Sequence, residues 1–169
     1  IAAAHARGQR HIARIAAQDD GRLVAMDVTF MLDQGAYLRP DGLQTAQLTA
    51  AMLPGPYRLD AFRAVGDVRL THKTPAGTYR AGGRYESTFV RERLVDAVAD
   101  KLGLDPVEVR QRNFLTPDEM PADREVSIAG SPVIYDSGDY TRLLQRTADT
   151  IGLARLRKRI ATRRAKGER

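Results

Sequence analysis

The sequence contains no cysteine and no tryptophan among its 169 residues. Without thiols, the chain can carry neither a disulfide nor a thiolate zinc site nor an iron–sulfur cluster of its own. It also lacks an apolar run of about 18 residues, the length that spans a membrane, and its first residues do not follow the pattern of a signal peptide. We therefore expect a soluble, cytoplasmic protein with no membrane partner.

Acidic residues are scarce at the end of the chain. From Ile151 onward there are eight basic residues and one acidic residue, a balance of +7, so residues 1–150 carry about −1 of the total charge of +6. A basic terminal helix can contact RNA, an acidic membrane or a partner protein, but such helices more often present solvated faces. We expect no nucleic-acid partner.

Metal-ligating side chains are also few. The chain has three histidines, and the spacing of His5 and His11 does not match a metal-binding motif. We therefore expect no metal site built from protein ligands.

Strand patterns dominate the first third of the sequence. Residues 11–17 and 23–32 are rich in β-compatible residues and flank a turn at 19–22, which predicts a hairpin. In the second run, alternate apolar residues share one face, which should pack inward. These inward residues are Val24, Met26, Val28 and Phe30.

Helix and strand patterns alternate in the rest of the chain. We expect helices at 43–53, 84–102, about 105–115 and from about Asp139, a strand at 65–71 and a hairpin over 125–135. Asp136 or Ser137 would cap the last helix, which either breaks at Gly152 or continues into the basic tail. This order, with hairpins rather than regular crossovers, predicts an α+β fold in which a mixed sheet with hairpins packs against helices.

The helix expected at 84–102 carries an apolar stripe that should face the core. Its members, at helical spacing, are Val90, Leu94, Ala97, Val98 and Leu102. The preceding segment, at 73–86, reads KTPAGTYRAGGRYE and connects the strand at 65–71 to this helix. Gly83 suits the N-cap position, and Glu86 suits the positive end of the helix dipole.

This glycine-rich junction admits two interpretations. Backbone N–H groups and two arginines, Arg80 and Arg84, could bind an anion. The spacing matches neither the dinucleotide fingerprint nor the P-loop, however, so the spacing alone favours a tight turn without a ligand.

Six motifs resemble those of a known family in order along the chain. They are DQGAY at 33–37, PGPY at 54–57, TPAGTYRAGGRYE at 74–86, FVRERLVD at 89–96, GLDPVEVRQRNFL at 103–115 and YDSGDY at 135–140. Together they resemble the molybdopterin-binding large subunit of the xanthine dehydrogenase, aldehyde oxidase and carbon monoxide dehydrogenase family. The resemblance covers nearly the whole chain.

This resemblance implies a molybdenum hydroxylase, an oxidoreductase that hydroxylates an aldehyde or N-heteroaromatic carbon with oxygen derived from water. The cofactor would be molybdenum bound to molybdopterin, in its plain or its cytosine dinucleotide form. Iron–sulfur clusters and FAD would lie on other domains or subunits. The expected partners are therefore the remainder of the molybdopterin subunit, the iron–sulfur and flavin subunits or domains, and a small-molecule substrate.

The resemblance also implies site residues. Arg80, Ala81, Gly82 and Gly83 align with the family segment that lies against the molybdenum end of the cofactor, and Arg80 could stabilise the transition state. Tyr37, Leu38 and Arg39 correspond to a region near the substrate pocket.

Two positions depart from particular members of the family. Ala81 stands where copper-containing carbon monoxide dehydrogenases carry a cysteine ligand, so oxidation of carbon monoxide is disfavoured. Gly82 stands where xanthine-oxidising members have a phenylalanine that stacks on the substrate, so purine specificity is not supported.

The family's catalytic glutamate, a general base, has no counterpart in the sequence. We therefore expect a fragment or one product of a split subunit, inactive alone, with residues 1–150 forming part of the molybdopterin-binding domain and residues 151–169 its basic C-terminal helix or tail. The alternative is a non-catalytic α+β binding module that contacts RNA or a partner protein through this helix.

Overall fold

A curved three-stranded sheet forms one layer of the computed structural model, which describes residues 5–168. Its strands, in the order β1-β2-β3, are β1 (Gln9–Ala17), β2 (Leu23–Gly35) and β3 (Ala61–Leu70). β1 and β2 form the expected antiparallel hairpin. β2 and β3 are parallel and are connected through helix α1 (Pro40–Met52).

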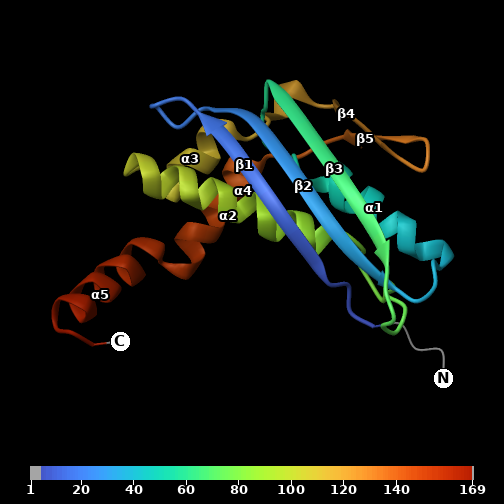
Figure 1. Ribbon diagram of the computed structural model, residues 1–169. Helices are drawn as coiled ribbons and strands as arrows, with labels where there is room; N and C mark the ends of the chain where they lie inside the picture. The colour runs from blue at the N-terminus through green and yellow to red at the C-terminus, as the bar shows by residue number, and fades with distance from the viewer. Residues whose placement is uncertain (1–4, 169) are drawn as a thin grey trace.

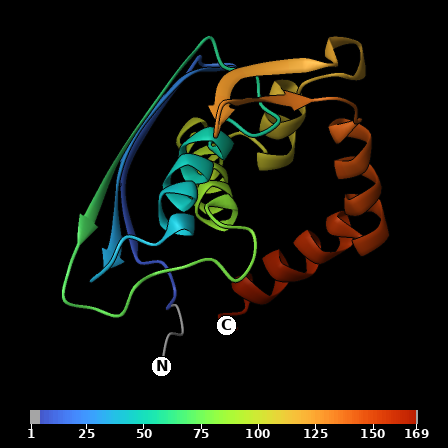
Figure 2. The ribbon, with the colours of Figure 1, turned by 90° about the vertical axis from the view of Figure 1, so that its right-hand side faces the viewer.

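This β2–α1–β3 connection corrects the expectation of hairpins without crossovers. A parallel pair needs a long connection, and α1 together with the segment after it provides one. Figure 2 shows the sheet as one layer with α1 and α2 packed on its concave side. The α+β fold class is confirmed.

The second half of the chain is mainly helical. Helix α2 (Arg84–Leu102) has the predicted bounds, and α3 (Pro106–Asn113) follows it directly. A 3₁₀ turn, η1 (Pro117–Glu119), leads into the hairpin of β4 (Ala122–Ile128) and β5 (Ser131–Tyr135). Figure 1 shows this hairpin beside α1, apart from the main sheet.

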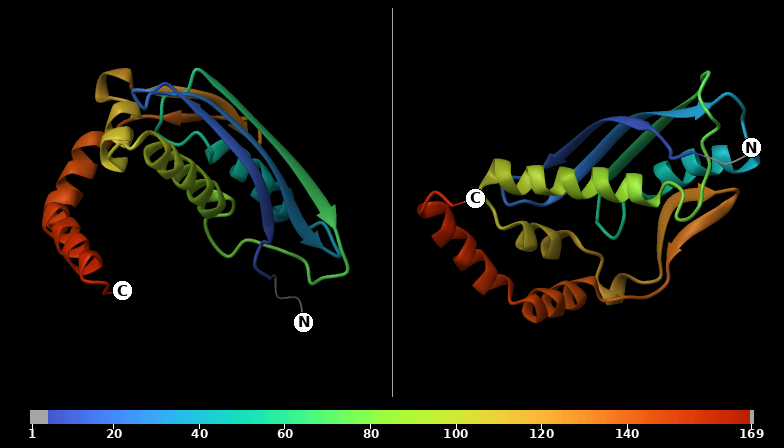
Figure 3. Two further views of the ribbon diagram at one scale, coloured as in Figure 1. Left: turned by 60° about the vertical axis from the view of Figure 1, so that its left-hand side comes forward. Right: turned by 90° about the horizontal axis from the view of Figure 1, so that it is seen from below.

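Two helices form an arm at the end of the chain. They are α4 (Tyr140–Ile151) and α5 (Leu153–Ala165), separated by Gly152 in the left-handed conformation (φ 63°). The helical segment therefore breaks at Gly152. Asp139 caps α4 by accepting a hydrogen bond from the Arg142 N–H, so neither Asp136 nor Ser137 is the cap residue. Figure 3 shows the arm projecting from the body.

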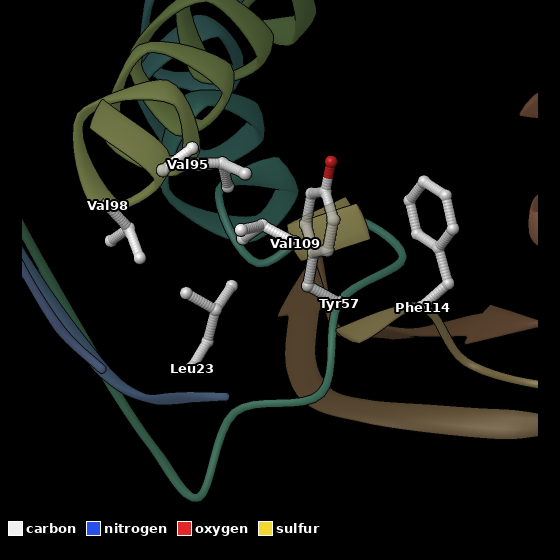
Figure 4. Packing of buried hydrophobic residues seen from close by; sticks show 7 residues of the cluster. Leu23, Tyr57, Val95, Val98, Val109 and Phe114 are labelled. Atoms are coloured by element: carbon white, nitrogen blue, oxygen red, sulfur yellow. The ribbon is translucent and has the colours of Figure 1, made fainter. Parts of the chain in front are cut away.

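The largest core cluster lies between the β1–β2 hairpin and helices α2 and α3. Tyr57 and Phe114 stack with ring centroids 5.0 Å apart, and the Tyr57 hydroxyl donates to Glu92. Figure 4 shows the side chains that meet here. The buried members are Leu23, Tyr57, Val95, Val98, Ala99, Val109 and Phe114.

Leu23 belongs to this core because β2 contains a bulge. Ala16 pairs with Ala25 and Ala17 pairs with Leu23, so Val24 is the extra residue. The predicted inward face is thus confirmed at Met26, Val28 and Phe30 and wrong at Val24, which is half-buried.

The predicted stripe of α2 is also only partly correct. Val90 and Val98 are buried, but Ala97 is exposed, and Leu94 and Leu102 are half-buried. α2 packs against α3 as well as the sheet, which widens its buried face. Val95 and Ala99 are buried on that wider face.

Candidate functional site

The glycine-rich segment at 73–86, called the glycine loop below, follows β3 and lies at the end of the sheet, as Figure 1 shows. Its beginning is held by main-chain hydrogen bonds to the N-terminal segment and to the end of β2. The His5 N–H donates to the Pro75 carbonyl at 3.1 Å, and the Ala76 N–H donates to the Gln34 carbonyl at 2.9 Å. The buried Gln34 side chain donates to the Ala76 carbonyl at 2.9 Å. The segment is therefore ordered before it reaches its glycines.

The glycine pair packs directly on α1. A Cβ on Gly83 would lie 2.3 Å from the Thr49 nitrogen and 2.6 Å from the Thr45 carbonyl oxygen. A Cβ on Gly82 would lie 2.6 Å from Thr78 Oγ1, which itself hydrogen-bonds Thr45 Oγ1. Both glycines are buried, so their lack of a side chain permits contact with α1.

The residues around the glycines form a tight turn into α2. Ala81 has a left-handed backbone (φ 46°), which is uncommon for a residue with a Cβ. The Ala81 carbonyl accepts from the Arg84 N–H, and the Gly83 carbonyl accepts from the Ser87 N–H. Gly83 is the N-cap of α2, as predicted, with φ 76°.

The tip of the loop is exposed. Tyr79 is 92% exposed, and the Arg80 guanidinium lies 6.0 Å from its ring centroid. The Tyr85 hydroxyl donates to the Arg80 carbonyl at 2.9 Å. The loop thus turns its glycines toward α1 while Arg80 is exposed on its surface.

The other predicted site residues lie in the connection between β2 and α1. Tyr37 and Leu38 are exposed, Arg39 is half-buried, and Arg39 is the N-cap of α1. The Ala36 N–H donates to the Lys73 carbonyl at 2.9 Å, which joins this connection to the base of the glycine loop. The structure therefore brings both predicted segments to the same end of the sheet.

Hydrogen bonds to the Asp33 carboxylate hold the start of the glycine loop. Asp33 accepts from Thr71 Oγ1 at 2.7 Å and from Lys73 Nζ at 2.5 Å. These hydrogen bonds, that from Lys73 foremost, lower the Asp33 pKa to about 2. Asp33 is therefore a carboxylate at neutral pH and ties the end of β2 to the segment after β3.

A groove lies beside the loop, between β1 and α2. Its volume is about 570 Å³, and its polar lining includes Arg7, Gln9, His11, Glu86 and Arg93. Gln9 Nε2 donates to Thr49 Oγ1, so the Gln9 oxygen is free to accept from His11 Nε2 at 2.8 Å. Burial lowers the His11 pKa, which favours the neutral ring at neutral pH.

The sequence interpretation missed the polar residues that hold the loop. Gln34 continues the inward face of β2, and a polar side chain at an inward position was a signal that could have identified it. Arg7 and Thr49 gave no such signal, because their contacts with the loop depend on the tertiary fold.

Among residues 5–168, no cluster of three histidine, aspartate or glutamate side chains is arranged to hold a metal ion. Within the same range, no helix has the length and hydropathy needed to cross a membrane.

Known proteins are similar to this chain over most of its length. The 6-hydroxypseudooxynicotine dehydrogenase complex subunit gamma of Paenarthrobacter nicotinovorans is 39% identical over 138 residues, which cover 82% of this chain and 17% of that protein. The aldehyde oxidoreductase of Megalodesulfovibrio gigas is 32% identical over 124 residues, covering 73% of this chain and 14% of that protein. The chain thus spans about a fifth or less of these relatives' length.

A solved structure extends the similarity to the arm. Quinoline 2-oxidoreductase from Pseudomonas putida 86 matches with a TM-score of 0.87 and 29% identity, covering 99% of this chain and 21% of that one. Residues 1–114 match the molybdopterin cofactor-binding domain, and the glycine loop lies within them. The resemblance in the sequence is therefore confirmed, and the chain belongs to the molybdopterin-binding subunits of the xanthine dehydrogenase, aldehyde oxidase and carbon monoxide dehydrogenase family.

Proposed function

We propose that this chain forms the part of a molybdenum hydroxylase large subunit that receives the molybdenum end of molybdopterin. The observation that carries the proposal is the glycine loop, whose tip is exposed while its glycines are locked against α1. A loop fixed in this way presents polar groups without having to order them when the ligand binds.

The residues present fit an anionic, polar cofactor. The Arg80 guanidinium offers forked donors and a positive charge at the exposed tip. Ala81 reverses the chain direction with its left-handed backbone, and α2 begins just behind it with the positive end of its dipole. Arg80 and Ala81 would hold the cofactor from the loop's outer surface, whereas Gly82 and Gly83 would act by bringing the loop close to α1.

The cofactor, when bound, supplies the redox chemistry of substrate hydroxylation. The chain's own contribution is to bind and orient it and to place a cation where negative charge develops. Arg80 is the candidate for that cation, because it lies at the loop tip. Tyr37, Leu38 and Arg39, at the same end of the sheet, are the candidates for the substrate side of the site.

We propose an aldehyde or N-heteroaromatic substrate for the complete enzyme, with water as the oxygen source. The names of an aldehyde oxidoreductase and a quinoline 2-oxidoreductase among the similar proteins support this class. Ala81 and Gly82 argue against carbon monoxide and purines, as stated above. We also propose partner subunits or domains that carry iron–sulfur clusters and FAD. The names of relatives as a complex subunit and as a large subunit support the existence of partner subunits.

We further propose that residues 151–169 belong to the same domain as residues 1–150. An ion pair between Arg157 of α5 and Asp105, the N-cap of α3, supports this assignment. The similarity of nearly the whole chain to one solved structure supports it too, and it weakens the alternative of an independent RNA-binding module.

The test is Arg80→Ala in the complete enzyme. Removing one preorganised donor from a charged transition state lowers kcat about a hundredfold, provided that the molybdenum content is unchanged. Steady-state dye reduction and metal analysis of the same preparation measure both quantities. A kcat within twofold of the parent at unchanged metal content would show that Arg80 is structural.

A further inference from the structure

Arg7 lies two residues before β1 and contacts the glycine loop at two points, Gly77 and Glu86. Its Nε donates to Glu86 Oε1 at 2.8 Å, and its Nη1 donates to the Gly77 carbonyl at 3.3 Å. Gly77 is the first glycine of the loop, and Glu86 lies in the first turn of α2. One side chain thus spans the segment that contains Arg80 and the glycine pair.

The Arg7–Glu86 pair is shielded from water. The two side chains are only 10% and 14% exposed. A carboxylate in such a place needs its partner, because burying an unpaired charge is strongly unfavourable. Glu86 Oε2 has no hydrogen-bond partner among the described residues, so the charge of Glu86 depends all the more on Arg7.

A second contact leads from Arg7 to the loop tip. The guanidinium lies 5.3 Å from the ring centroid of Tyr85, within the range of a cation–π interaction. The Tyr85 hydroxyl in turn donates to the Arg80 carbonyl at 2.9 Å. The position of Arg7 therefore bears on the backbone of Arg80 through one intervening side chain.

We propose that Arg7 is a positioning residue for the cofactor loop: it clamps residues 77–86 and so fixes the backbone that carries Arg80 and Ala81. The inference rests on the proposed function of that loop. Arg7 itself is nearly buried behind the loop, and it acts through Gly77, Tyr85 and Glu86 rather than by contact with the cofactor.

The geometry explains why the residue is an arginine. The two hydrogen bonds leave from different nitrogens toward acceptors on different segments, while the planar guanidinium lies near an aromatic ring. A lysine has a single ammonium group and cannot reproduce this planar fork. Arg7→Lys should therefore behave more like a loss of the clamp than like a conservative change.

The first measurement uses the 169-residue chain and needs no cofactor. Arg80 and Arg84 are exposed, so trypsin cleavage after them reports local opening of the loop. We expect Arg7→Gln to accelerate cleavage at these two sites about tenfold and Arg7→Lys to accelerate it nearly as much. Arg10→Gln is the matched control, because Arg10 lies three residues further on the exposed face of β1, and it should leave the rates unchanged.

The second measurement uses the complete enzyme. Arg7→Gln should lower the molybdenum content severalfold, and in the fraction that retains metal it should lower kcat with little change in KM. Glu86→Gln removes the other partner of the ion pair and leaves the Arg7 contacts with Gly77 and Tyr85, so it should have a smaller effect than Arg7→Gln. The double variant should be little worse than Arg7→Gln, because the pair is already broken in that variant. Thermal midpoints of all variants identify losses that come from unfolding. If Arg7→Gln does not fold, Arg7→Lys and Glu86→Gln carry the same test.

The outcomes separate the clamp from the proposed function. Unchanged cleavage after Arg80 and Arg84 would overturn the clamp, whatever happens to the metal content. Faster cleavage with normal molybdenum content and normal turnover would support the clamp but overturn the assignment of this loop to the cofactor. Faster cleavage together with lost metal and reduced kcat would support both.

Discussion

Helices α2 and α5 show two different ways in which a helix is held in this protein. α2 packs between the sheet, α1 and α3 and has six buried residues, whereas α5 has none. α5 is linked to the body by the exposed ion pair between Arg157 and Asp105. Tertiary packing supplies most of the stability of a helix of ordinary length, so the glycine loop precedes a well-packed helix while α5 depends on weaker contacts.

The largest effect should come from Gly83→Val at the start of α2. The new side chain would collide with the α1 backbone and would force a β-branched residue into a left-handed conformation. We expect a loss of about 3–5 kcal/mol, or a thermal midpoint lower by about 10 °C. Differential scanning calorimetry measures the midpoint, and molybdenum analysis of the complete enzyme shows whether the loss extends to cofactor content.

Gly103→Val, at the other end of α2, is the matched control for Gly83→Val. Gly103 also has a left-handed backbone (φ 66°), but within residues 5–168 no atom beyond its chain neighbours and its own helix lies within 4 Å of its added Cβ. The control therefore introduces backbone strain alone, about 1–2 kcal/mol. Equal losses at the two glycines would show that contact with α1 does not matter.

A pair of truncations compares the body with the arm directly. Leu23 is 1% exposed in the main core, and Leu23→Ala should cost about 2–5 kcal/mol. Ile160 of α5 is 47% exposed, and Ile160→Ala should cost less than about 0.5 kcal/mol. Urea unfolding followed by circular dichroism gives both values. A cost for Ile160→Ala equal to that for Leu23→Ala would mean that the arm is as well packed as the body.

The smallest effect concerns the link between arm and body. The hydrogen bond from Arg157 lowers the Asp105 pKa, so the pair stabilises the fold above the ordinary aspartate pKa of about 3.9. Because the folded-state pKa is the lower one, this contribution is lost as the pH falls through it. Arg157→Gln should thus cost less than about 1 kcal/mol at pH 7 and nothing in strong acid. Urea unfolding at several pH values checks this, and a difference independent of pH would contradict it.

Local signals in the sequence predicted the parts of the fold that depend on local chemistry. Gly83 is the N-cap of α2, as predicted, and α2 has the predicted bounds. Gly103 ends α2 and Asp105 caps α3 by accepting from the Val107 N–H, and both are residue types that favour these positions. The position of the glycine loop before α2 followed from the same signals. The resemblance to the family added the expectation of a cofactor.

Contacts distant in sequence were not predictable in this way. Arg7 and Glu86 are 79 residues apart, and only the tertiary fold brings them together. Leu43 is exposed on α1 although it is apolar, because the threonines at 45 and 49 take the inward positions against the glycine loop. Packing partners, and not periodicity, decide which face of such a helix is buried.

The parallel arrangement of β2 and β3 has a consequence for how this subunit can diversify. Both strands end at the same edge of the sheet, so the connection with Tyr37 and Leu38 and the loop with Arg80 leave from neighbouring points. Their bases are joined by the hydrogen bond between Ala36 and Lys73 and by the Asp33 contacts. Substitutions beyond those bases can change one loop and leave the other in place. The two loops can therefore vary in sequence independently of each other, while the sheet edge from which both leave is preserved.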